Sequence, residues 1–198
     1  AFWNHDEDRI EEVLRGCSEE EITFLNTNPE AKKVVKDVRG SLGGCDLDVM
    51  DTLLDQKISK EERATQANGI RLFDSMEGWG TDEDKIKQIL EGANTPEERA
   101  RLRAQFNAYA ASKPYTAVTE GWSGGKGGEG DDMLSRALGE EFSGGELTLV
   151  NTLAKTERNE QDVKVAKMIA GADGAGTNED QIFDALDDAE YAAKWKAA

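Results

Sequence analysis

The chain has 198 residues, of which 37% are hydrophobic, and this is enough to form one modest hydrophobic core. Its formal net charge of −17 at pH 7 excludes binding to nucleic acid or to anionic membranes through basic patches. The acidic balance is compatible with divalent-cation binding, although a solvated acidic surface accounts for most of the carboxylates. No run of residues is long and apolar enough to cross a bilayer.

Helical periodicity begins near the N-terminus. Ile10, Val13 and Leu14 follow an acidic start at Asp6 with the spacing of one apolar helix face. The same reasoning predicts helices over residues 7–16, 19–26, 31–42, 47–54 and 60–76. Ser59 is a suitable N-cap for the last of these helices. Helix formers dominate the composition and there are only three prolines, so we expect an all-α fold.

A glycine-rich turn follows at residues 76–84, which read Met-Glu-Gly-Trp-Gly-Thr-Asp-Glu-Asp. Gly78 and Gly80 let the backbone bend where larger residues would clash. Thr81 is expected to cap the next helix in a capping box with Asp84, and the acidic residues place negative charge at the positive end of that helix. The apolar face of the helix consists of Ile86, Ile89 and Leu90.

The second half of the chain continues the helical pattern around one interruption. Thr95 is expected to cap a helix that begins at Pro96, and Asn159 to cap a later helix. Residues 113–132 contain too much glycine for a helix and are predicted to form a flexible loop. Shorter helices are predicted over residues 133–138 and 147–153, separated by a loop over residues 139–145.

The helices recur along the chain as repeats. Helix starts at Asp6, Asp82 and Asn178 lie 76 and 96 residues apart, and residues 44–53 match residues 144–153 at an offset of 100. A period of this length indicates a helical array. The increase in the offset from 76 to 100 within the second copy locates an insert of 24 residues, which we place in the glycine-rich loop.

We therefore divide a single all-α domain, residues 1–198, into three repeats. Residues 6–63 form a degenerate repeat, residues 64–158 form a full repeat that contains the insert at 113–132, and residues 159–198 form a partial third repeat. The segment that aligns with the turn in the first copy lacks both glycines. We therefore expect this copy to have a structural role and not to form the cation-binding turn.

Residues 76–83 resemble the annexin repeat signature, Met-Lys-Gly-x-Gly-Thr-Asp-Glu, with Glu77 in place of the usual lysine. Residues 174–179 are also similar to it, and residues 142–144, preceded by Glu141, resemble a later step of the annexin repeat. The resemblance covers one full repeat, a degenerate repeat before it and the opening of a third, whereas annexins usually carry four. It implies annexin-like helical repeats in a single compact domain.

The resemblance implies a Ca²⁺ site built from backbone carbonyl oxygens and one bidentate carboxylate. The implied ligands are the carbonyls near Met76, Gly78 and Gly80 and the carboxylate of Glu141, with Glu140 as the near alternative. A weaker second site is implied at Gly174 and Gly176. The separation of 61 residues between Gly80 and Glu141 exceeds the family's usual spacing, and the insert accounts for the excess if it loops out without moving the helices.

The remaining coordination sites of the ion would hold water or a lipid phosphate oxygen. The resemblance therefore implies Ca²⁺-dependent, peripheral binding to anionic phospholipid membranes. Trp79 lies at the tip of the turn, where its indole could insert among headgroups, and packing on a neighbouring helix is the alternative. Cys17 and Cys45 fit buried thiols in a cytoplasmic protein or a disulfide in a secreted one, so the compartment stays open.

Two other functions remain open. Glu120 in the insert and Glu141 could supply the paired carboxylates of glycoside hydrolysis, for instance in a secreted bacterial hydrolase acting on a cell-wall glycan. A Ser-His-Asp triad and a zinc site are disfavoured because His5 is the only histidine. The other function is a helical protein-interaction module that kept the scaffold, lost the cation and binds its partner through the insert at 113–132.

Overall fold

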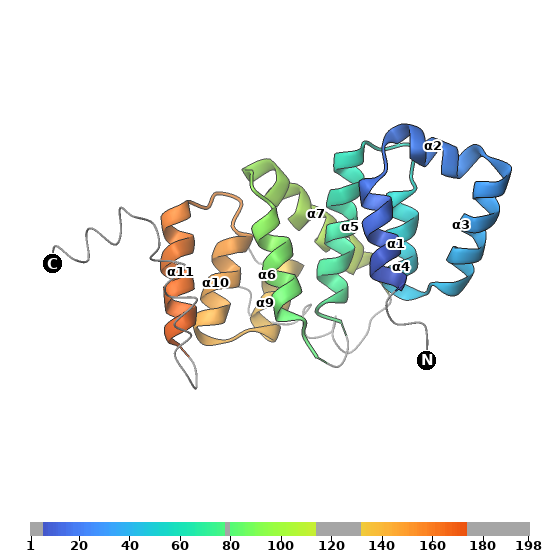
Figure 1. The fold of residues 1–198 in the computed structure, drawn as a ribbon. Coiled ribbons are helices and arrows are strands. Elements are labelled where there is room, and N and C mark those ends of the chain that lie inside the picture. The colour runs from blue at the N-terminus through green and yellow to red at the C-terminus, as the bar shows by residue number, and fades with distance from the viewer. Residues whose placement is uncertain (1–5, 78–79, 114–131, 174–198) are drawn as a thin grey trace.

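The described part of the chain is entirely helical. The computed structural model describes residues 6–77, 80–113 and 132–173, which contain ten α-helices and no strand (Figure 1), and this confirms the all-α prediction. The helices are α1 (Asp6–Gly16), α2 (Glu19–Thr27), α3 (Pro29–Ser41), α4 (Gly44–Leu53), α5 (Lys60–Asp74), α6 (Glu83–Gly92), α7 (Pro96–Ser112), α9 (Met133–Glu141), α10 (Gly144–Ala154) and α11 (Glu160–Ala172). None of these helices has the length and apolar character needed to cross a membrane.

Seven of the described helices begin at a polar side chain that accepts a hydrogen bond from a backbone N–H of the first turn. Ser59, Thr95 and Asn159 cap α5, α7 and α11 as predicted. Ser18 and Asn28 do the same for α2 and α3. At the starts of α2 and α7 a glutamate side chain also bonds back to the cap residue, which completes a capping box.

The predicted loop over residues 139–145 is largely helical, so this prediction is wrong. Helix α9 continues to Glu141 and α10 begins at Gly144. Gly144 has a φ of +57°, a left-handed conformation that favours glycine and lets the chain turn directly into α10. Gly44 has a φ of +55° at the start of α4, the equivalent position in the first copy.

Helix α5 packs between α4 and α7 (Figure 1). Gly69 lets α5 and α7 approach closely, because a Cβ atom there would lie 2.9 Å from the Cβ of Gln105 and 3.1 Å from the backbone nitrogen of Phe106. Phe73 packs against Phe106 and Tyr109, with ring centroids 6.3 Å and 5.2 Å apart. The buried residues at the centre of this core include Ala67, Leu72, Phe73 and Met76.

The contacts between helices repeat along the chain. The packed pairs α1–α4, α2–α3 and α4–α5 recur as α6–α10, α7–α9 and α10–α11. The two sets differ in their third helix, because α3 contains no buried residue whereas its counterpart α9 buries Leu134, Ala137 and Leu138. The architecture is therefore repeat-like, with a looser first copy.

Arg71 of α5 joins three helices through ion pairs. Its side chain is 5% exposed and donates to Glu11 of α1 and Asp46 of α4 at 2.6 Å each, and to Asp74 at 3.1 Å. Burial by itself raises the pKa of Glu11, but the charges of Arg71 and Arg15 outweigh it and hold this pKa below its ordinary value. The stability from this carboxylate is present above its unfolded pKa and is lost as the pH falls through the lower folded pKa.

We expect Gly69→Ala to lower the free energy of unfolding by about 1–3 kcal/mol, because the added methyl group presses on α7. Gly40→Ala is the matched control, since Gly40 lies within α3 and a Cβ atom there meets nothing within 4 Å. The control should gain up to ~1 kcal/mol from helix propensity. Urea unfolding measures both changes, and an equal gain in the two variants would contradict the close approach of α5 and α7.

We expect Glu11→Gln to cost about 1–3 kcal/mol of stability at pH 7, because Arg71 and Arg15 lose a charged acceptor. The deficit relative to wild type should shrink as the pH falls below the ordinary glutamate pKa and through the lowered pKa of Glu11, because this carboxylate then becomes protonated in the wild type. Thermal unfolding from pH 7 to pH 3 measures this deficit, with Glu12→Gln as the control at an exposed carboxylate of the same helix. A deficit that does not change with pH would rule out the charge interaction as its cause.

Candidate functional site

A backbone hydrogen bond closes the turn between α5 and α6. The Asp82 N–H donates to the Ser75 carbonyl at 3.0 Å and so connects the two ends of the turn. Gly80 has a φ of +113°, a backbone conformation that side-chain-bearing residues rarely adopt. Gly78 and Trp79 lie outside the described residues. The conformation at Gly80 thus explains why this position carries glycine.

Thr81 does not cap α6, and the predicted capping box with Asp84 is wrong. Asp82 is the N-cap, since its side chain accepts the Lys85 N–H at 3.0 Å. The Thr81 hydroxyl instead donates to Oε2 of Glu141. The threonine therefore connects the turn to another part of the molecule.

Glu141 is the last residue of α9 and is half-buried, and its contact with Thr81 spans 60 residues of sequence. Glu140 is exposed. Of the two candidate carboxylates, only that of Glu141 is hydrogen-bonded to the turn among the described residues. The fold thus brings Glu141 beside Gly80 and Thr81.

Contacts at the end of the insert explain how α9 lies next to the turn, although the insert lengthens the sequence between Gly80 and Glu141. Asp132 precedes α9, caps it, and accepts hydrogen bonds from Arg103 at 2.6 Å and Asn107 at 3.1 Å, both on α7. Helices α7 and α9 consequently pack directly against each other. Residues 114–131, which include Glu120, lie outside the described residues. The extra sequence length therefore does not displace α9 from α7.

The first copy lacks the carboxylate of this arrangement. Ser41 stands at the position of Glu141 in the first copy, where its hydroxyl donates to the Val38 carbonyl at 2.7 Å. A hydroxyl offers a weaker cation ligand than a carboxylate, so the first copy lacks the equivalent donor. The second implied site, at Gly174 and Gly176, lies outside the described residues.

The oxygen atoms around the turn fit the donor set that Ca²⁺ prefers. The carbonyls of Met76 and Gly80 accept no backbone hydrogen bond within the described ranges, and Glu141 adds a carboxylate. Within the same ranges no group of three or more His, Cys, Asp or Glu side chains could hold a metal ion. A cation at this turn would therefore depend on carbonyl oxygens, one carboxylate and water.

A second polar site, not predicted from the sequence, lies between α4 and α7. Asp48 accepts hydrogen bonds from Tyr109 at 2.6 Å and Lys113 at 2.5 Å, and the Lys113 ammonium lies 4.3 Å from the Tyr109 ring centroid. These residues border a cleft of about 560 Å³. Burial raises the pKa of the Tyr109 hydroxyl, which keeps it a donor to Asp48. The group is internally satisfied, and it anchors the end of α7 to α4.

Comparison of the sequence with protein-family models and with curated proteins finds no match. The function must therefore be inferred from the residues of the site and their geometry.

We expect Glu141→Ala to lower the free energy of unfolding by about 1 kcal/mol in chelator, because the Thr81 hydroxyl loses its acceptor. Glu140→Ala removes the adjacent exposed carboxylate and should stay within about 0.5 kcal/mol of wild type. Urea unfolding compares the two variants, which carry the same change in net charge. A similar cost in both would show that Glu141 does not hold the turn to α9.

Proposed function

We propose that the protein binds anionic phospholipid membranes in a Ca²⁺-dependent manner through the turn that faces Glu141. The observation that carries this proposal is the hydrogen bond between Thr81 and Glu141, which places a carboxylate beside the glycine turn although 60 residues separate them in sequence. Turns of this kind expose carbonyl oxygens, and a nearby carboxylate completes a donor set typical of Ca²⁺ sites.

The carbonyls near Met76, Gly78 and Gly80 and the carboxylate of Glu141 would hold the ion. Oε2 of Glu141 accepts the Thr81 hydroxyl, and each carboxylate oxygen has a second lone pair with which it can coordinate a cation. Thr81 therefore orients the carboxylate for the ion. The bound ion supplies positive charge that attracts a lipid phosphate oxygen.

The charge of the protein explains why a cation is needed. A net charge of −17 repels an anionic membrane surface, and this repulsion is long-ranged at low ionic strength. Ca²⁺ at the turn offsets the repulsion locally. Trp79, which lies between the two glycines in sequence, would add interfacial contact with the headgroups.

Co-sedimentation with phosphatidylserine vesicles tests the proposal. Wild-type protein should pellet with vesicles in Ca²⁺ and remain in the supernatant after chelation. Glu141→Gln and Gly80→Val should raise the Ca²⁺ concentration for half-maximal pelleting by about tenfold or more, a loss of roughly 1.4 kcal/mol. Gly80→Val acts by excluding the φ of +113°.

Glu140→Gln is the matched control, because it removes an equal charge at an exposed neighbouring carboxylate. It should pellet at the wild-type Ca²⁺ concentration, and circular dichroism should show that all variants keep the helical fold. Pelleting that is absent in millimolar Ca²⁺, or that is equal in Glu141→Gln and Glu140→Gln, would overturn the proposal. The remaining interpretation would then be a cation-free helical interaction module.

A further inference from the structure

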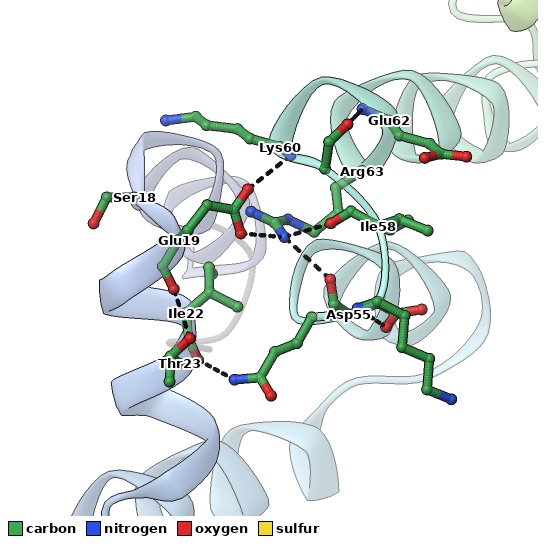
Figure 2. Close-up of polar contacts among 12 residues, drawn as sticks. Ser18, Glu19, Ile22, Thr23, Asp55, Ile58, Lys60, Glu62 and Arg63 are labelled. Atoms are coloured by element: carbon green, nitrogen blue, oxygen red, sulfur yellow. Dashed lines mark hydrogen bonds and ion pairs between the residues drawn. The ribbon is translucent and has the colours of Figure 1, made fainter.

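One buried arginine holds together the loops at one end of the first copy (Figure 2). Arg63 of α5 is 2% exposed, and its Nη1 donates to the carbonyls of Asp55 and Ile58 at 3.1 Å and 2.9 Å. The same nitrogen bonds Oε2 of Glu19 at 2.9 Å, and Glu19 also accepts the Lys60 N–H at 2.9 Å. The positive charge of this guanidinium is therefore balanced by a carboxylate.

The corresponding loops of the second copy contain a guanidinium from a different helix. Arg99 of α7 is 5% exposed, its Nε donates to the Thr156 carbonyl at 2.8 Å, and its Nη1 donates to the carbonyls of Ala93 and Asn94 at 3.1 Å and 2.9 Å. All three acceptors are neutral carbonyl groups. Among the described residues, no carboxylate hydrogen-bonds to this arginine.

A second guanidinium, that of Arg158, lies in the loop between α10 and α11. Its Nη1 donates to the carbonyls of Leu90 and Leu153 at 3.0 Å and 2.9 Å, and its Nη2 donates to the Glu91 carbonyl at 3.2 Å. Burial lowers the pKa of Arg158, and the nearby charge of Arg99 lowers it further. Both guanidinium groups bond carbonyls at or just after the end of α6, and both border the same cavity.

When helix positions are counted from the N-cap, each copy carries its buried arginine on a different helix of an equivalent pair. Ile22 of α2 and Arg99 of α7 occupy the same helix position, and so do Arg63 of α5 and Val163 of α11. Glu19, which neutralises Arg63, corresponds to Pro96 at the first position of α7. The second copy has therefore gained a guanidinium at Arg158 and lost the balancing carboxylate.

These two arginines line a cavity of about 240 Å³, smaller than a typical site for a drug-sized ligand. The polar and charged residues around it are Arg99, Arg158, Lys167, Glu91, Asn94 and Glu160. The Glu91 carboxylate bonds Lys167 at 2.6 Å, and Glu160 is exposed. Nη2 of Arg99 and Nε of Arg158 donate no hydrogen bond within the described ranges, so both have donors to offer a ligand.

We propose that this cavity binds a small tetrahedral oxyanion of the phosphate type. Guanidinium groups recognise phosphate oxygens through paired N–H donors, and partial burial strengthens such charge-assisted hydrogen bonds. The cavity is lined by Glu91 and Asn94 at the C-terminal end of α6, whereas Gly80 precedes the N-terminal end of this helix. A membrane bound at the turn would not reach it, so the ligand is a soluble phosphate rather than a lipid headgroup.

Titration of the full chain with inorganic phosphate tests this proposal. The buffer contains chelator and has constant ionic strength, and binding is measured by calorimetry and by the change in melting temperature. Wild-type protein should bind phosphate and melt at a higher temperature in phosphate than in chloride. Arg158→Gln should weaken binding by about tenfold or more. Arg39→Gln, which makes the same change in charge at an arginine paired with Asp51 on the surface, should bind as wild type does.

Glu160→Gln provides a second variant that keeps the proposal testable if Arg158→Gln does not fold. It removes an exposed negative charge at the cavity and should tighten phosphate binding by about threefold. An absence of phosphate binding by wild type, or equal weakening by Arg39→Gln and Arg158→Gln, would overturn the proposal. Displacement of phosphate by phosphatidylserine vesicles in chelator would overturn the assignment to a soluble anion.

Discussion

Buried guanidinium groups hold one end of the helical array together, because helix ends and tight loops leave carbonyl groups that need donors. A guanidinium carries five N–H groups on a rigid plane, so one side chain can serve carbonyls from two loops at once. Arg99 does this for the α6–α7 and α10–α11 connections. Arg63 bonds two carbonyls of the α4–α5 connection, and the half-buried Arg158 bonds carbonyls near the ends of α6 and α10. The packing of these helix ends thus depends on a few buried or half-buried cations in a strongly acidic protein.

The opposite end of the helices is built from glycine turns. Gly44, Gly80 and Gly144 adopt positive φ at or just before the starts of α4, α6 and α10. Near two of these turns the donors bond carboxylates, since the buried guanidinium of Arg71 bonds Asp46 at 2.6 Å and the Gly145 N–H donates to Asp173 at 2.6 Å. Among the described residues, the hydrogen bond between Thr81 and Glu141 joins the α5–α6 turn to α9. The two ends therefore differ in their bonding, because guanidinium groups bond backbone carbonyls at one end whereas Arg71 bonds carboxylates at the other.

The sequence alone predicted the features that depend on residues close together in the chain. Helix positions followed from apolar spacing, and Ser59, Thr95 and Asn159 were predicted caps because each precedes its helix directly. The role of Thr81 was not predictable, since its partner lies 60 residues away and a local capping box offered an equally reasonable use of its hydroxyl. The arginine contacts were missed because their acceptors are backbone carbonyls, which residue identity does not reveal.

The reciprocal placement of Arg63 and Arg99 limits how the two copies can exchange sequence with each other. In a hybrid that kept α7 but carried the α5 sequence in place of α11, Arg99 and Arg63 would both be present. Two guanidinium groups would then be buried where each natural pair of helices buries one. A hybrid with α2 and α11 would bury Ile22 against Val163 and leave loop carbonyls without a donor, at a cost of about 1–3 kcal/mol for each unsatisfied group. A recombination point between the two helices of such a pair would therefore destabilise the fold.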